Sequence, residues 1–156
     1  MVYRIGSYKY PTRILLGFTA GFFGTLILNQ TTVWVLYHVG VSPFNGFSMV
    51  RNGFGVPMVL SAAFWGGVWG IVFALVEHKL PVHRGYLMTA FLFGAVVLSV
   101  VFLLVVLPLK GEPVGGGWHL PLLLTVFLGN GAWGIGTGLV LEGLLRWMSG
   151  WRHVPA

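Results

Sequence analysis

The sequence predicts an all-α membrane protein that crosses the bilayer four times, with residues 1–156 forming a single domain. Three observations predict this fold class. Only 8% of the residues are charged and 56% are hydrophobic, whereas a soluble domain carries about 25% charged residues. The apolar residues fall in four long blocks, and most basic residues lie on one side of these blocks. Water is therefore not the main solvent of this chain.

Each of the four blocks is long enough to cross the hydrocarbon, which is about 30 Å thick and takes about 20 helical residues. We expect spans at residues 14–37, 56–76, 86–107 and 120–145. Each must be helical, because a spanning backbone finds no water to bond its amides and carbonyls. Pro57, Pro108 and Pro121 lie near the expected span ends, where a proline costs the helix least.

The basic residues predict the orientation of the spans. Seven of the nine lie on the side that holds both chain ends and the loop at residues 77–85, and two lie on the other side. Because loops rich in Lys and Arg stay inside, we expect both termini in the cytoplasm. The net charge of +6 then reflects topology and contact with anionic lipid, so no nucleic-acid partner is expected. The seven are Arg4, Lys9, Arg13, Lys79, Arg84, Arg146 and Arg152, and the two are Arg51 and Lys110.

The chain also matches itself. A shift of 64 residues relates the second span to the fourth, and a weaker match at 70 residues relates the first to the third. We interpret the chain as two tandem helical hairpins, a parallel repeat with its pseudo-twofold axis along the membrane normal. The matches are Pro57 with Pro121, Gly67 with Gly131, Trp69-Gly70-Ile71 with Trp133-Gly134-Ile135, Thr19-Ala20 with Thr89-Ala90, and Phe23-Gly24 with Phe93-Gly94.

Small residues mark the expected helix contacts, because helices in lipid associate through close backbone approach rather than through the hydrophobic effect. A strip with a spacing of four runs along the second span, and its register continues in the fourth span. We therefore expect these two spans to touch or nearly touch. The strip residues are Ala62, Gly66, Gly70 and Ala74 in the second span, and Gly134 and Gly138 in the fourth.

Three amides lie at similar depth in the expected membrane: Asn29 and Gln30 in the first span and Asn130 in the fourth. An amide facing lipid is costly, so we expect these side chains to face the bundle and to bond to one another, to neighbouring threonines or to a water. Two interpretations remain open for them. They are contacts between helices, or they form a polar site for a small ligand or ion.

A second polar group lies at the expected cytoplasmic ends of the spans. Glu77 and His78 end the second span, and the repeat places His78 opposite Glu142 of the fourth. A Glu beside a His favours a pair that relays protons or holds a lipid headgroup. The alternative is that these side chains simply extend into the interface.

The sequence contains no complete catalytic or metal-binding set. It has no Cys and no Asp, and its carboxylates, Glu77, Glu112 and Glu142, are divided between the two faces. We predict no catalytic residues, no metal and no cofactor. A membrane enzyme or haem subunit would require His38 or His119, near the outer ends of spans, as a ligand. The loop at residues 40–55 is apolar, so we expect it to lie along the outer interface or to fold back over the helices.

Residues 54–71, 108–111 and 130–134 resemble a group of small uncharacterised bacterial membrane proteins with four predicted spans. This resemblance covers most of the chain and implies the bacterial inner membrane and the same topology. It implies no activity. The sequence thus predicts a non-enzymatic membrane protein, either an accessory or structural subunit or a self-associating bundle, whose partners are the bilayer and copies of itself or other membrane subunits. The alternative is a small transporter or channel that uses Asn29, Gln30 and Asn130.

Overall fold

The all-α class and the four membrane-length helices are confirmed. The structure is a computed structural model that describes residues 5–81 and 85–151. Among these residues, four helices are long and apolar enough to cross a membrane: Tyr10–His38, Met58–Lys79, Tyr86–Leu109 and Leu120–Gly150. The largest difference from expectation is the end of the fourth helix, which lies at Trp151 instead of residue 145. A helix continues past the hydrocarbon wherever its backbone still bonds to itself, so the lipid boundary does not end it.

Two of the spans are interrupted by π-helical turns, which insert an extra residue into the helical ladder. The first span consists of α1 (Tyr10–Gly24), a π-helical turn (Thr25–Asn29) and α2 (Gln30–His38). The third consists of α4 (Tyr86–Leu92), α5 (Ser99–Val101) and α6 (Leu107–Leu109), joined by π-helical turns at Phe93–Leu98 and Phe102–Val106. The second span is α3 (Met58–Val76), which continues into a 3-10 turn (Glu77–Lys79), and the fourth is α7 (Leu120–Trp151).

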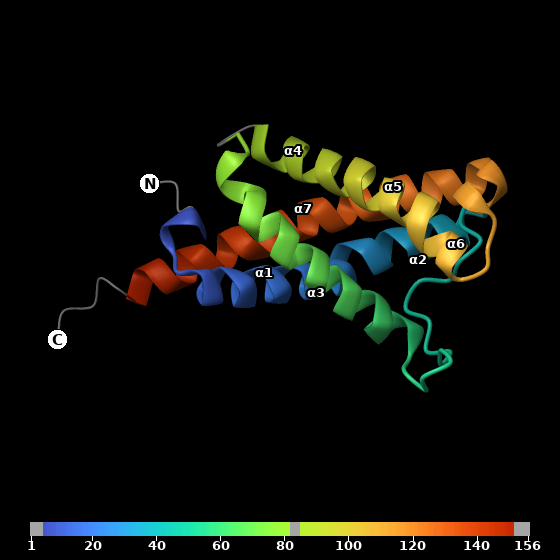
Figure 1. Cartoon of the computed structure of the whole chain (residues 1–156), viewed down its shortest axis with the longest axis horizontal. Helices are drawn as coiled ribbons and strands as arrows, with labels where there is room; N and C mark the ends of the chain where they lie inside the picture. Colours follow the sequence, from blue (N-terminus) through green and yellow to red (C-terminus); the bar gives the residue numbers. More distant parts are fainter. Residues whose placement is uncertain (1–4, 82–84, 152–156) are drawn as a thin grey trace.

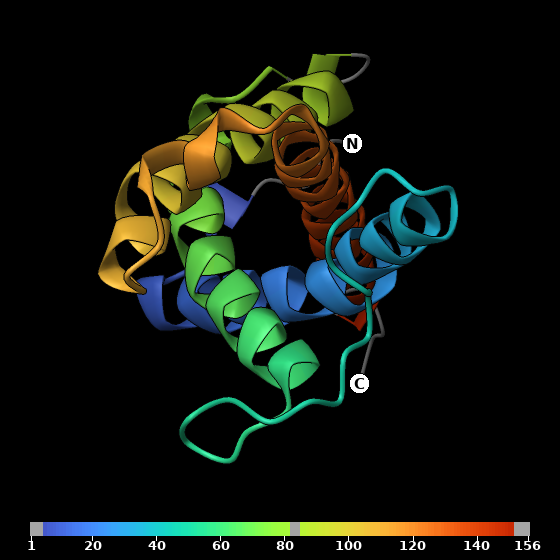
Figure 2. The ribbon, with the colours of Figure 1, turned by 90° about the vertical axis from the view of Figure 1, so that its right-hand side faces the viewer.

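The spans run alternately in opposite directions. Figure 1 shows that α1 begins and α7 ends at the same end of the molecule as the turn between α3 and α4, while the two longer loops lie at the other end. We refer to these as the terminal end and the loop end. Seen from the loop end, the four spans surround a common interior (Figure 2).

Glycines bring α1 and α3 into backbone contact. A Cβ at Gly17 would lie 2.6 Å from the carbonyl oxygen of Gly70 and 2.7 Å from the Cβ of Ala74. Gly21 and Gly66 meet in the same way, with the carbonyl oxygen of Gly66 where a Cβ of Gly21 would be. The strip on α3 therefore faces α1.

The second strip, on α7, faces the third span. Gly134 lies against the carbonyl oxygen of Ala90, and Gly94 lies against that of Asn130. A Cβ at Gly138 would lie 3.2 Å from the ring of Tyr86. Close backbone contact thus joins the first span to the second and the third span to the fourth.

The second and fourth spans meet, as expected, but not through their strips of small residues, and that part of the expectation is wrong. α3 and α7 meet instead through large side chains, with the Phe73 and Trp133 rings 6.4 Å apart between centroids. The physical reason is that α1 offers complementary glycines at positions 17 and 21, which let α3 approach more closely than α7 permits. Ala62, at the loop end of the strip, is only half-buried.

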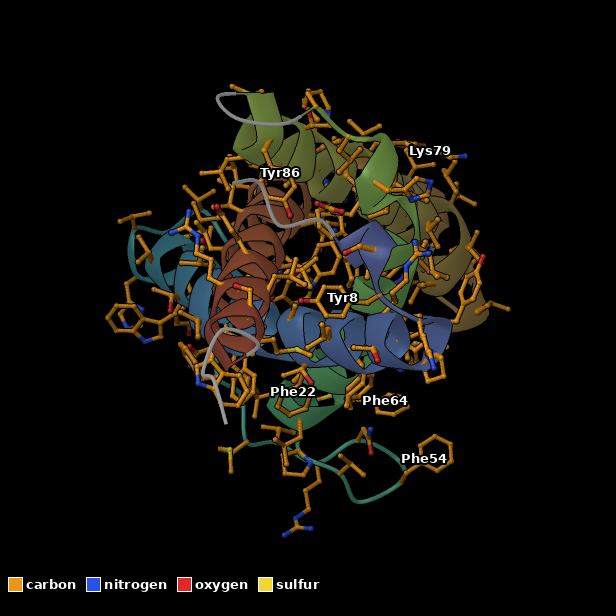
Figure 3. All side chains as sticks on the ribbon, turned by 90° about the vertical axis from the view of Figure 1, so that its left-hand side faces the viewer. Tyr8, Phe22, Phe54, Phe64, Lys79 and Tyr86 are labelled. Carbon is orange, nitrogen blue, oxygen red and sulfur yellow. The ribbon has the colours of Figure 1, made fainter. Side chains whose placement is uncertain are left out.

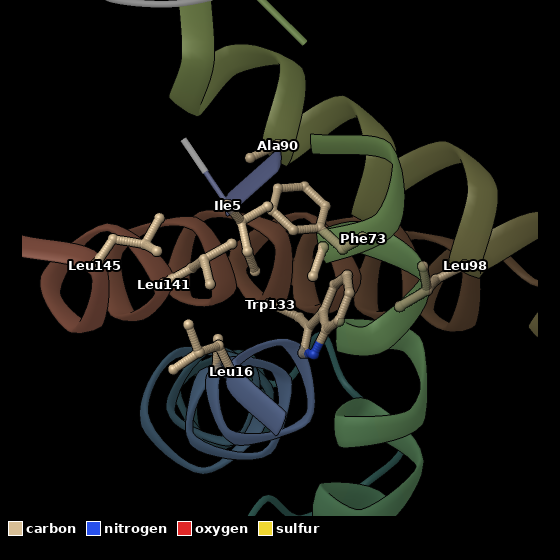
Figure 4. Packing of buried hydrophobic residues seen from close by; sticks show 10 residues of the cluster. Ile5, Leu16, Phe73, Ala90, Leu98, Trp133, Leu141 and Leu145 are labelled. Atoms are coloured by element: carbon tan, nitrogen blue, oxygen red, sulfur yellow. The ribbon is translucent and has the colours of Figure 1, made fainter. Parts of the chain in front are cut away.

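Aromatic and aliphatic side chains fill the interior of the bundle. Trp133 and Phe73 are almost completely buried, and Ile5 reaches the same cluster from the 3-10 turn Ile5–Ser7 that precedes α1 (Figure 4). Leu141 of α7 lies beside Ile5, and Leu145 belongs to the same cluster further along α7. The segment before the first span is therefore part of the core.

Candidate functional sites

Gln30 joins the first span to the loop between α2 and α3. Its Oε1 accepts a hydrogen bond from the backbone N–H of Phe47 at 2.8 Å, and its Nε2 donates to Asn29 Oδ1 at 3.0 Å. Phe47 has a positive φ of 57°, which is unusual for a bulky residue. Gly46, just before it, packs directly on the backbone of Trp34. The loop at residues 40–55 thus folds back over the helices at α2, which is one of its two expected positions.

Asn130 faces the third span. Its Nδ2 donates to Ser99 Oγ at 3.1 Å, and Ser99 Oγ donates in turn to the carbonyl oxygen of Val126 at 3.3 Å. Ser99 is completely buried. This short chain of hydrogen bonds joins α5 to α7 inside the membrane-length part of both spans.

The three amides are divided between two places. Asn29 and Gln30 bond to each other, whereas Asn130 bonds to Ser99. A Cβ at Gly129 would lie 3.3 Å from Asn29 Nδ2, so Asn29 lies beside the turn of α7 that carries Asn130, whose own side chain points to the third span. Ser99 has no special position in the sequence. Ser99 could have been predicted as a partner of Asn130 because it is a polar residue within the span that precedes the one carrying this amide.

Glu142 and His78 both lie at the terminal end. Glu142 forms an ion pair with Arg146, one turn along α7. His78 lies with its Nδ1 3.5 Å from the Nη2 of Arg13, and its Cβ packs against Gly6.

Glu77, unlike His78, is buried. Tyr86, the first residue of α4, lies within electrostatic reach of both Glu77 and Glu142. In a view onto this end, Tyr8 lies near the centre and Lys79 at the rim (Figure 3). The phenol of Tyr86 therefore lies near both carboxylates.

Arg13 is the side chain whose role the sequence does not predict. It counts as a topology signal in the sequence, yet only 7% of it is exposed. Its Nη2 donates to the carbonyl oxygens of Leu75 at 3.1 Å and Ala74 at 3.4 Å. These carbonyls belong to the last turn of α3, where helix carbonyls lack partners and a cation is favourable. Arg13 thus caps α3 from α1.

The two histidines near the outer ends of spans lie on the surface. His38 is exposed, with its Nδ1 2.8 Å from the carbonyl oxygen of Trp34, and His119 is exposed beside Gly117. Within residues 5–81 and 85–151, no three His, Asp or Glu side chains gather as metal ligands would.

The chain matches no protein-family model, no curated protein and no solved structure at a significant level. Its function is therefore inferred from the geometry of its own residues.

Proposed function

We propose that this chain is a non-enzymatic integral membrane protein that is either an accessory or structural subunit or a self-associating helical bundle. One observation carries the proposal: the amides at membrane depth are engaged in contacts that hold the protein together. Gln30 holds a loop against α2, and Asn130 holds α7 against Ser99. A transport site needs polar groups that exchange protein partners for a substrate, and these groups have partners within the fold.

The burial of these groups supports the same conclusion. Only 9% of Gln30 is exposed, and both ends of its amide are bonded. Hydrogen bonds between membrane helices, such as that from Asn130 to Ser99, contribute about 0.6 kcal/mol each on average. Their contribution is therefore modest, and orientation of helix and loop is the role that fits them.

We further propose that the chain consists of two tandem hairpins related by a parallel repeat. Equivalent contacts support this: Gly67 lies under the ring of Phe18, and Gly131 lies under the ring of Phe91. Gly67 and Gly131 are 64 residues apart, as in the sequence match. Phe18 and Phe91 are 73 residues apart, three more than the 70 of the weaker match. We therefore align the first and third spans by the equivalent contacts of Phe18 and Phe91 rather than by the identical residues of the weaker sequence match.

The proposed location is the inner membrane of a bacterium, with both termini cytoplasmic. The distribution of charge supports this orientation, since Lys9, Arg13, Lys79 and Arg146 belong to the terminal end, and Arg51 and Lys110 to the loop end. Three further basic residues used in the prediction, Arg4, Arg84 and Arg152, lie outside the described residues.

The test is native mass spectrometry of the protein extracted in mild detergent together with its lipids. A subunit is expected to appear as an oligomer or with a stoichiometric membrane partner. A monomer without partners, both at native expression and after overexpression, would contradict the proposal.

The second candidate is a small transporter or channel, favoured by one observation: Asn29 is only half-buried beside Gly129. Flux assays in proteoliposomes with wild-type protein and the Asn130→Leu variant address it directly. Ion or solute flux that the variant abolishes, while the variant keeps its fold, would favour transport over the subunit role.

A further inference from the structure

The loop between α2 and α3 carries a rigid finger, residues 48–59. Its two arms run antiparallel, with an isolated bridge between Arg51 and Pro57. Three backbone hydrogen bonds join the arms: Met58 N–H to Val50 O at 2.9 Å, Val59 N–H to Ser48 O at 3.0 Å, and Asn52 N–H to Val56 O at 2.9 Å. The finger is therefore an ordered extension of α3 rather than a free connector.

The tip of the finger satisfies its own polar groups. Asn52 Oδ1 accepts from the N–H groups of Phe54 at 3.0 Å and Val56 at 3.1 Å. The N–H of Gly55 donates to the carbonyl oxygen of Asn52 at 2.9 Å, and Gly55 accepts from Arg51 Nη1 at 2.8 Å. A backbone that is already hydrogen-bonded loses less on entering a medium of low polarity.

The side chains that the finger presents are apolar. Phe54 is 93% exposed, Val50 71% and Met49 69%. The finger continues from the start of α3 and projects to the side of the helical bundle rather than beyond its loop end (Figure 1). In a view along the long axis, Phe54 lies outside the helices, further out than Phe64 (Figure 3). If the four helices span a membrane, a finger that projects sideways from their loop end runs parallel to the membrane surface.

We propose that the finger inserts into the headgroup and upper acyl region of the leaflet at the loop end, with Phe54, Met49 and Val50 in contact with lipid. Phe and other large apolar side chains of interfacial segments are buried at the boundary between headgroups and acyl chains, and removing them from water is favourable. Arg51, the one charged residue of the finger, has its Nη1 bonded to Gly55, which holds the guanidinium beside the tip for a lipid phosphate. The finger fixes the depth and rotation of α3 in the membrane.

The test uses the natural absence of cysteine. A nitroxide label is placed at Gly53→Cys, where a side chain meets open space, and at Glu112→Cys in the exposed second loop as the control. The labelled protein is reconstituted at high dilution in phosphatidylglycerol and phosphatidylethanolamine vesicles. Relaxation by oxygen, which prefers lipid, is compared with relaxation by a water-soluble nickel complex.

We expect the ratio of oxygen to nickel accessibility to be several-fold higher at position 53 than at position 112. Adding Phe54→Ser and Met49→Ser should lower the ratio at position 53 toward that of the control while the fold is kept. Equal ratios at the two positions would overturn the proposal. A high ratio that appears only at high protein density, with dipolar broadening between labels, would also overturn it, because the finger would then dock on a second copy.

Discussion

Trp133 of α7 donates its indole N–H to the carbonyl oxygen of Gly21 in α1, at 3.1 Å. Both residues are buried. The same oxygen accepts the hydroxyl of Thr25 at 2.9 Å, at the start of the π-helical turn in the first span. This one backbone atom thus receives bonds from two helices, at the point where the first span meets both α3 and α7.

The first prediction concerns this bond. Trp133→Phe removes the donor and leaves a small void, so we expect the free energy of unfolding to fall by about 1–3 kcal/mol. Unfolding in mixed detergent, followed by circular dichroism, measures the change. Trp147→Phe, at an exposed position on the same helix, is the control and should leave stability nearly unchanged. Equal effects of the two variants would refute the role of the Trp133 contact.

The glycine contact between α1 and α3 gives the second prediction. Gly70→Ala places a methyl group against the backbone of Gly17 and Gly21. To make room for it, α1 and α3 must move apart. We expect a loss of about 1–3 kcal/mol, as for other overpacked interiors. Gly143→Ala is the matched control, since its Cβ meets open space and alanine favours a helix over glycine by about 1 kcal/mol. The two variants should therefore move the melting temperature in opposite directions, and a stable Gly70→Ala protein would contradict the backbone contact.

The third prediction concerns Gln30. Gln30→Met keeps the shape of the side chain but removes the acceptor of the Phe47 N–H. We expect faster hydrogen exchange at the amide of Phe47, and earlier proteolysis of the loop at residues 40–55, with little change in the helices. Thr31→Val, whose hydroxyl bonds only to its own helix in the described contacts, serves as the comparison. Unchanged exchange at Phe47 would show that the loop is held by other contacts.

Hydropathy and charge predicted the number and positions of the membrane-length helices, because the length of each apolar block is set by the thickness of the hydrocarbon. They did not predict which helices touch. The strip of Gly66 and Gly70 has the same pattern whether its partner is α1 or α7, and only the complementary positions of Gly17 and Gly21 decide between them.

The candidate sites were predicted less completely. The sequence identified Asn29, Gln30 and Asn130 as groups that need partners, and the expected bond between two of them, Asn29 and Gln30, is present. The other partners are a backbone amide in a loop and a serine on another span. Neither partner stands out in a linear sequence. Arg13 was not predicted to cap a helix. A basic residue near the end of a span is expected from the charge bias alone, so its sequence position does not reveal that it also caps α3.

The central claim, that four helices cross the bilayer with both ends of the chain on one face, is tested most directly by labelling single cysteines with a membrane-impermeant thiol reagent. We expect Asn45→Cys and Glu112→Cys to react in intact cells. Lys9→Cys, Lys79→Cys and Gly150→Cys should react only after the membrane is permeabilised. Reaction of Lys9→Cys and Gly150→Cys on opposite faces would contradict the account.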